Sequence, residues 1–111
     1  MFKTLILEAS FSDDKKKKVW EKGNIIKSYD KDKIRQDECG AWIKWDKYGD
    51  RNSSYGWEID HITPTSKGGS DKLSNLRPLH WKNNASRQDD ALACVITSDG
   101  NKNKDIGDDA E

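Results

Sequence analysis

The chain has 111 residues, of which 32% are hydrophobic and 36% are charged, so it is long enough for one small domain with a modest core. Five tryptophans supply the large apolar side chains that such a core needs. The formal net charge is zero, which excludes a global electrostatic attraction to nucleic acid and leaves only local basic patches. Two cysteines are too few for a disulfide framework or a four-thiolate zinc site, so we expect a reducing, cytoplasmic environment.

A helix is the first element that the residues predict. Residues 1–11 fit either a short strand or a helical lead-in, and their apolar run is too short for a signal or membrane-spanning segment. Ser12, which two acids follow, is typical of a helix N-terminus, and Gly23 is typical of a helix end. The lysines from Lys15 to Lys18 form either a solvated face of this helix or an arm that contacts phosphate.

Two strands separated by a turn are predicted next. Residues 41–45 and 55–62 are rich in β-favouring side chains, and residues 48–54 are dense in turn formers. Because side chains alternate between the faces of a strand, Glu58 and Asp60 share one face and are expected to point toward solvent or a cation. The other face of this strand carries Trp57, Ile59 and His61.

A glycine loop leads to the second strand of a hairpin and then to a helix. The loop at residues 63–71 contains paired glycines, which allow a positive φ or the close approach of a ligand. A strand is expected over Leu76–Leu79 and a helix over His80–Gln88. By helical spacing, Asn84 and Arg87 share a face with the first residue of this helix.

The C-terminal part of the chain is mostly polar. An apolar patch over residues 91–97 is expected to dock on the domain as a helix end or a strand. Residues 98–111 are rich in acids and have no apolar period, which predicts a disordered tail. These boundaries give a single domain over residues 1–97.

The run from Gly56 to Arg87 contains WEIDHI, then P, SKGG, NLRPLHW and NNASR. In this order and spacing the run resembles the HNH endonuclease family, with a weaker likeness over Cys39–Ile43. The resemblance implies an α+β fold, namely a small ββα-metal domain (HNH, or His-Me finger) with its motif core at residues 55–88. This chain adds an N-terminal helix and short strands to that core. The family cuts nucleic-acid phosphodiesters with a divalent cation.

Many members of that family hold a structural zinc with two pairs of cysteines. The corresponding positions here are occupied by Gln36, Cys39, His80 and Asn83. A tetrahedral structural zinc normally needs Cys or His at all four positions, so we expect no structural zinc. Cys39 is interpreted instead as a small buried residue in a tight turn.

The Asp-His pair is the predicted centre of the chemistry. His61 is the candidate general base, because an imidazole can take a proton from water near neutral pH. Asp60 offers a hard anionic oxygen, and the resemblance implies that Asn84 is a second metal ligand. These oxygen ligands favour Mg²⁺ or Mn²⁺ over zinc. With Asn84 in the last position, the chain is an H-N-N variant of the motif.

Two further residues complete the predicted catalytic set with His61. By resemblance, Asn75 joins the loop to the strand and holds the backbone beside His61. Arg87 is the predicted partner of the scissile phosphate, since a guanidinium binds phosphate in a bidentate manner. The residues leave open whether His80 or Glu58 also joins the metal site.

The predicted function is that of a metal-dependent endonuclease that hydrolyses phosphodiester bonds in DNA, with duplex DNA favoured as the substrate. The basic residues predicted to contact nucleic acid are Lys67, Arg77 and Lys82. A homodimer or a larger protein partner would help so small a domain to cut both strands, and no membrane partner is expected. Two alternatives remain: a nucleic-acid-binding module of the same fold that does not cleave, and a toxin-type nuclease held by a partner protein.

Overall fold

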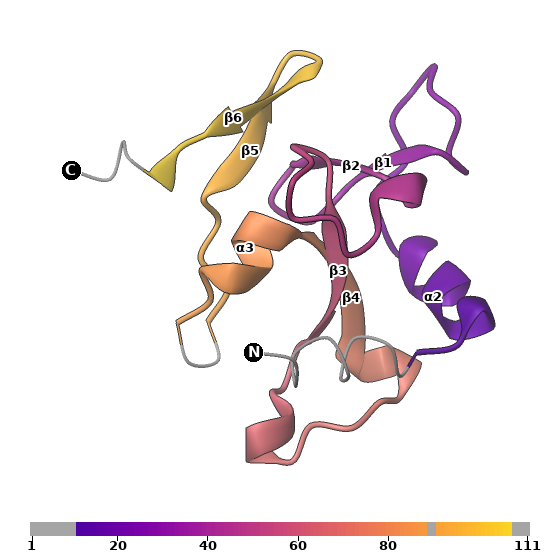
Figure 1. Ribbon diagram of the computed structural model, residues 1–111, viewed down its shortest axis with the longest axis vertical. Helices are drawn as coiled ribbons and strands as arrows, with labels where there is room; N and C mark the ends of the chain where they lie inside the picture. Colours follow the sequence, from indigo (N-terminus) through magenta and orange to yellow (C-terminus); the bar gives the residue numbers. More distant parts are fainter. Residues whose placement is uncertain (1–10, 89–90, 108–111) are drawn as a thin grey trace.

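The computed structural model describes residues 11–88 and 91–107, and Figure 1 shows its elements. In chain order the helices and strands are α2 (Asp13–Trp20), β1 (Ile34–Gln36), β2 (Trp42–Lys44), β3 (Trp57–His61), β4 (Leu76–His80), α3 (Trp81–Ala85), β5 (Ile96–Asp99) and β6 (Lys102–Asp105). Short 3₁₀ helices are η1 (Trp45–Lys47), η2 (Thr65–Lys67) and η3 (Leu73–Asn75). This mixture confirms the α+β class. The expectations for residues 1–10 fall outside the described residues.

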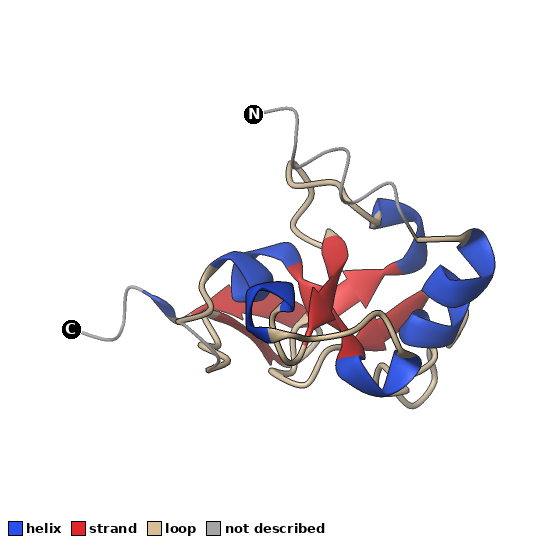
Figure 2. Cartoon of the chain, turned by 90° about the horizontal axis from the view of Figure 1, so that it is seen from below, coloured by secondary structure: helices blue, strands red, loops and turns tan. Residues whose placement is uncertain are grey.

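The hairpin of β3 and β4 is central to the arrangement. Figures 1 and 2 show α2 and α3 on opposite sides of it. The two strands are antiparallel, with Trp57 opposite His80 at one end and His61 opposite Leu76 at the other. Residues that face each other in such a pair project to the same side of the sheet, so the register fixes which side chains can meet.

The core lies between α2 and this hairpin. The Ser12 side chain caps α2 by accepting a hydrogen bond from the amide of Lys15 at 3.1 Å. The helix then buries Val19 and Trp20 completely. They pack in one cluster with Ile43, Trp57 and Leu76. The indole rings of Trp20 and Trp57 have centroids 5.1 Å apart. The tryptophans therefore build the core that the composition predicted, and α2 supplies one side of it.

The predicted hairpin and helix are present, with the helix shorter than expected. The strands expected over 55–62 and Leu76–Leu79 correspond to β3 and β4. Helix α3 ends at Ala85, and the amide of Ser86 closes it by donating to the carbonyl oxygen of Lys82 at 3.0 Å. Arg87 therefore lies just beyond the helix, and its side chain reaches back to the hairpin.

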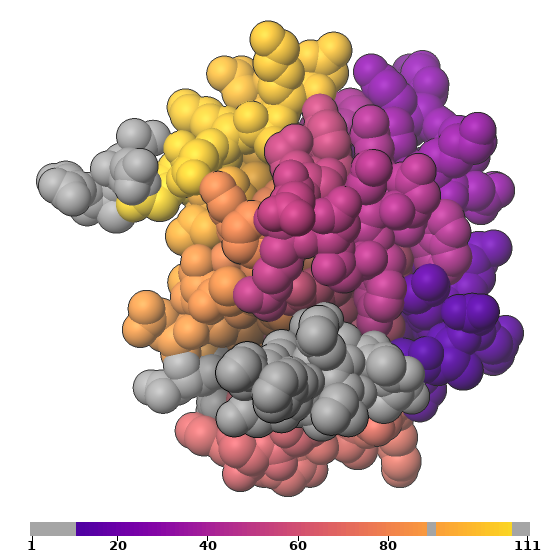
Figure 3. Space-filling model, in the orientation of Figure 1, coloured from indigo at the N-terminus to yellow at the C-terminus, as the bar shows by residue number. Residues whose placement is uncertain are grey.

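Residues 98–107 are folded, so the expectation of a disordered tail is wrong for them. Residues 98–105 belong to the β5–β6 hairpin, whose turn contains Gly100 with a φ of 65°. Asn103 of β6 donates to the carbonyl oxygens of Trp42 (3.0 Å) and Ser54 (2.9 Å). In Figure 3 the yellow atoms of this hairpin lie against the central part of the molecule. The attachment is polar, which explains why no apolar period marks it in the sequence.

The two cysteines form a disulfide, so the interpretation of Cys39 as a small buried residue is wrong. Cys39 is only half-buried and is bonded to Cys94, which lies 55 positions later in the sequence, with a Cα–Cα distance of 5.6 Å. The bond joins the turn between β1 and β2 to the segment that enters β5.

Within residues 11–88 and 91–107, no helix has the length and apolar composition needed to cross a bilayer.

Reduction of this disulfide is expected to lower the free energy of unfolding by about 4 kcal/mol, the chain-entropy estimate for a loop of this length. Urea unfolding followed by far-UV circular dichroism, with and without a phosphine reductant, measures the change. The double variant Cys39→Ser and Cys94→Ser is the control. Its urea midpoint should equal that of the reduced protein and should not change when the reductant is added. Equal urea midpoints for oxidised and reduced wild type would contradict the expectation.

Candidate active site

Asp60 lies on the side of the hairpin that faces α3. Its carboxylate is almost fully buried and accepts from Nε of Arg77 at 2.7 Å and from Nη1 of Arg87 at 2.8 Å. Arg77 is the residue directly opposite Asp60 in the strand register, which is why the two side chains meet. Of the two expected directions for Asp60, solvent or a cation, solvent is wrong, because two guanidinium groups enclose the buried carboxylate. A buried carboxylate needs such partners to offset its lost hydration.

Glu58 occupies the same face, two residues before Asp60, and it is also buried rather than directed to solvent. Arg51 donates to both oxygens of this carboxylate, from Nε at 2.6 Å and from Nη2 at 2.8 Å. Asn84 of α3 donates its Nδ2 to Glu58 at 2.9 Å. This bond fixes the direction of the Asn84 amide, so its Oδ1 is the atom that can bind a cation.

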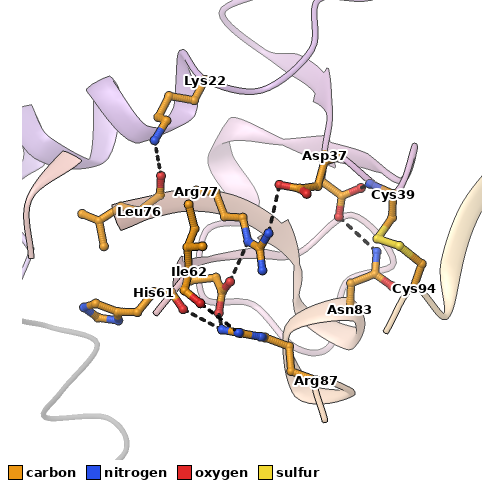
Figure 4. Close-up of polar contacts among 12 residues, drawn as sticks. Lys22, Asp37, Cys39, His61, Ile62, Leu76, Arg77, Asn83, Arg87 and Cys94 are labelled. Carbon is orange, nitrogen blue, oxygen red and sulfur yellow. Dashed lines mark hydrogen bonds and ion pairs between the residues drawn. A yellow bond between two sulfur atoms is a disulfide. The ribbon is translucent and has the colours of Figure 1, made fainter. Parts of the chain in front are cut away.

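His61 lies on the opposite face of β3, as alternation along a strand requires. Figure 4 shows its imidazole pointing away from the guanidinium groups of Arg77 and Arg87. Its Nε2 is 2.7 Å from Oδ1 of Asp71, and its ring centroid is 5.9 Å from that of Phe11. The backbone of His61 still faces the Asp60 side, because its carbonyl oxygen accepts from Nη1 of Arg87 at 2.6 Å. Arg87 thus contacts both members of the Asp-His pair.

Asn75 holds the loop between β3 and β4 closed. Its Oδ1 accepts from the amide of Thr63 at 2.8 Å, and its Nδ2 donates to the carbonyl oxygens of Thr63 (3.1 Å) and Ser70 (2.8 Å). Its own carbonyl oxygen accepts from the amide of Ile62 at 2.8 Å, immediately after His61. The side chain and the backbone of Asn75 together fix both ends of the loop beside the candidate base.

His80 is engaged in local structure, which removes it as a rival metal ligand in this arrangement. Its Nδ1 accepts from the amide of Lys82 at 3.1 Å and so caps α3, while its Nε2 donates to the carbonyl oxygen of Ser54 at 2.8 Å. The side chain is almost completely buried. Burial lowers the pKa of His80 below its usual value, which keeps the ring neutral.

The basic residues predicted to contact nucleic acid differ in accessibility. Lys67 is exposed on the loop. The side chain of Lys82 is 43% exposed and lies 3.7 Å from a carboxylate oxygen of Asp105. The side chain of Arg77 is only 12% exposed and binds Glu38 as well as Asp60. Because it is largely buried and paired with two carboxylates, Arg77 is better placed to orient Asp60 than to contact a phosphate backbone.

Asp37 joins the positions at which a zinc knuckle would be built, and sequence reasoning missed it. This carboxylate is 1% exposed and accepts hydrogen bonds from the amides of Cys39 (3.0 Å) and Ala41 (2.9 Å) through Oδ1. Its Oδ2 accepts from the amide of His80 (2.9 Å) and from Nδ2 of Asn83 (3.0 Å). An Asp at the start of a glycine-containing turn can accept a hydrogen bond from the backbone amide two residues later. This pattern is the signal that could have revealed the role of Asp37.

The donor chemistry of this face fits a hard divalent cation, subject to one condition. Asp60, Glu58 and Asn84 offer carboxylate and amide oxygens, which are the ligands that Mg²⁺ and Mn²⁺ prefer. Both oxygens of Asp60 are paired with arginines, so a cation must compete with a guanidinium for that carboxylate. In the part of the chain that the structure describes, no group of three or more His, Cys, Asp or Glu side chains could hold a metal ion.

The comparison with protein families gives one result that covers this site. Residues 37–89 match the family model described as HNH endonuclease, which spans Asp37, both strands of the hairpin and α3. No curated protein and no solved structure matches the chain.

Proposed function

The chain belongs to the HNH endonuclease family, and on that premise we propose that it is a metal-dependent endonuclease that hydrolyses phosphodiester bonds in duplex DNA. In this proposal β3, β4 and α3 form the ββα-metal unit of the family. The observation that carries it is the arrangement around Arg87, whose guanidinium contacts Asp60 and the backbone of His61 at 2.8 Å and 2.6 Å. A predicted metal ligand and a predicted phosphate-binding group thus meet the backbone of the predicted base at the end of one strand, and the imidazole of that base lies on the other face (Figure 4).

Each residue has a separate task in the proposed reaction. Asp60 and Asn84 would hold Mg²⁺ or Mn²⁺, which would supply Lewis-acid stabilisation of the phosphate and of the leaving 3′ oxygen when bound. His61 takes the proton from the attacking water. Arg87 exchanges a carboxylate oxygen for an oxygen of the scissile phosphate, because a guanidinium pairs equally well with either anion. Asn75 keeps the loop beside His61 in place.

The surroundings of Asp60 explain how such a site stays intact before the substrate arrives. An isolated buried carboxylate would be costly, and Arg77 and Arg87 neutralise it. Arg87 would be the guanidinium released to the phosphate, because Arg77 would still neutralise part of the Asp60 charge. Lys67 and Lys82 are the accessible cations that we propose to contact the nucleic-acid backbone nearby.

Removal of divalent metal is expected to abolish cleavage. Supercoiled plasmid should be nicked or linearised by the purified chain with Mg²⁺ or Mn²⁺, and should remain intact with EDTA until excess Mg²⁺ is added back. Far-UV circular dichroism in EDTA is the control that separates loss of chemistry from loss of fold. Undiminished cleavage in EDTA would overturn the proposed metal dependence.

A second candidate function is a nucleic-acid-binding module that does not cleave. The double pairing of Asp60 with arginines favours it, since a carboxylate that never releases a guanidinium would leave no place for a cation. Salt-dependent DNA binding without cleavage under any metal condition would support this candidate.

The predicted cytoplasmic location also remains a proposal, and the Cys39–Cys94 disulfide is more typical of oxidising compartments.

A further inference from the structure

The loop between β3 and β4 carries a single acidic side chain, that of Asp71, and this side chain contacts the candidate base. Its Oδ1 lies 2.7 Å from Nε2 of His61. The side chain of Asp71 is 64% exposed and that of His61 is 23% exposed. A contact between charged groups at such a surface contributes little to stability. Its effect on the orientation of the imidazole is therefore of more interest than its effect on folding.

The backbone that presents Asp71 is held on both sides. Asn75 binds the carbonyl oxygen of Ser70 through its Nδ2 at 2.8 Å. Lys15 of α2 donates to the carbonyl oxygen of Asp71 itself at 2.6 Å. Lys22, two residues after the end of the same helix, donates to the carbonyl oxygens of Leu73 and Leu76. The carboxylate of Asp71 thus projects from a fixed segment, even though the side chain is exposed.

The imidazole of His61 is restrained on two sides by these surroundings. Phe11 packs against the ring at an interplanar angle of 40°, and Asp71 occupies Nε2. A carboxylate only accepts hydrogen bonds, so the proton of a neutral ring must reside on Nε2. Nδ1 is then left with its lone pair, and it has no hydrogen-bond partner among the residues that the structure describes.

We propose that Asp71 is a positioning residue for His61: its carboxylate selects the Nε2–H tautomer and turns Nδ1 toward the attacking water. This inference rests on the proposed nuclease function. In the step that follows, a water proton moves to Nδ1 while the water oxygen bonds to phosphorus and the bond to the leaving 3′ oxygen breaks. The imidazolium so formed keeps its Nε2–H bonded to the carboxylate, which stabilises the new positive charge.

The first test is kinetic and uses plasmid or a defined duplex as the substrate. Asp71→Ala is expected to lower kcat by about 10–100-fold, the usual effect of removing a partner that orients a reacting histidine, with KM changed less than about twofold. Asp71→Glu should recover most of the lost rate, because it restores the acceptor. Asp14→Ala is the matched control: it removes the same charge from a side chain that is 82% exposed on α2 and should cleave as wild type does.

The second test does not need turnover. In ¹⁵N spectra of the metal-free protein, the neutral ring of His61 should show a protonated Nε2 and an unprotonated Nδ1, and Asp71→Ala should show a mixture of the two tautomers. Wild-type kcat in Asp71→Ala, or a wild-type ring with its proton on Nδ1, would overturn the positioning role while leaving the nuclease proposal intact. If the wild-type chain cleaves nothing, the nuclease proposal fails, and the spectra still decide whether Asp71 sets the tautomer.

Discussion

Replacement of His61 with alanine is expected to lower kcat for DNA cleavage by about 10²–10⁴-fold, the range over which a positioned general base acts. The free energy of unfolding should change little, because the ring is partly exposed and its contacts are with Asp71 and Phe11 rather than with the core. Plasmid cleavage measures the first quantity and urea unfolding the second. DNA affinity, measured by fluorescence anisotropy, should remain within about twofold of wild type, since the proposed contacts with the nucleic-acid backbone come from Lys67 and Lys82.

The other histidine of the chain supplies the control for this experiment. His80 caps α3 and is 2% exposed, so His80→Asn should lower the free energy of unfolding. It should nevertheless cleave at close to the wild-type rate at temperatures where it is folded, because both ring nitrogens of His80 serve local structure. The two variants are thus expected to show opposite patterns. Wild-type cleavage by His61→Ala would remove His61 from the mechanism.

Replacement of Asp37 with alanine is expected to lower the free energy of unfolding by about 3–5 kcal/mol. The variant would leave four N–H donors without their acceptor, at Cys39, Ala41, His80 and Asn83. These donors come from the turn after β1, from the end of β4 and from α3, so the loss affects the junction of three elements. A small domain has only about 5–15 kcal/mol of total stability, and this variant should be close to unfolding.

Urea unfolding compares Asp37→Ala with two further variants. Asp37→Asn retains one acceptor oxygen and should fall between alanine and wild type. Asp46→Ala removes the same charge from an exposed position and should stay within about 0.5 kcal/mol of wild type. A loss below about 1 kcal/mol in Asp37→Ala would mean that water replaces the carboxylate at these donors.

Local patterns were enough to predict the central elements. The β-favouring residues before His61 and the short run from Leu76 gave the two strands of the hairpin, and Ser12 with its following acids gave the start of α2. These features depend on neighbours in the sequence, which is where propensity and capping act. The family was also predictable, because its motif is a fixed order of residues within one continuous segment.

Long-range pairings could not be predicted in the same way. Alternation placed Glu58 and Asp60 on one face of β3, yet nothing in the spacing indicated that Arg51, Arg77 and Arg87 would enclose them. The bond between Cys39 and Cys94 spans 55 residues, and two cysteines alone do not reveal whether they meet. The β5–β6 hairpin is attached through Asn103, a residue type that sequence reasoning assigns to turns and loops.

The segment that matches the family model is shorter than the unit that folds, so this segment alone is not a transferable domain. Residues 37–89 lack Val19 and Trp20, which form one side of the core, and they lack Cys94, the partner of Cys39. Asn83 of α3 also relies on the later chain, since its Oδ1 accepts from the amides of Val95 and Ile96 at 2.8 Å. A fusion protein that includes this domain must therefore carry α2 and the segment through β6, because a chain trimmed to residues 37–89 would expose its tryptophans to solvent.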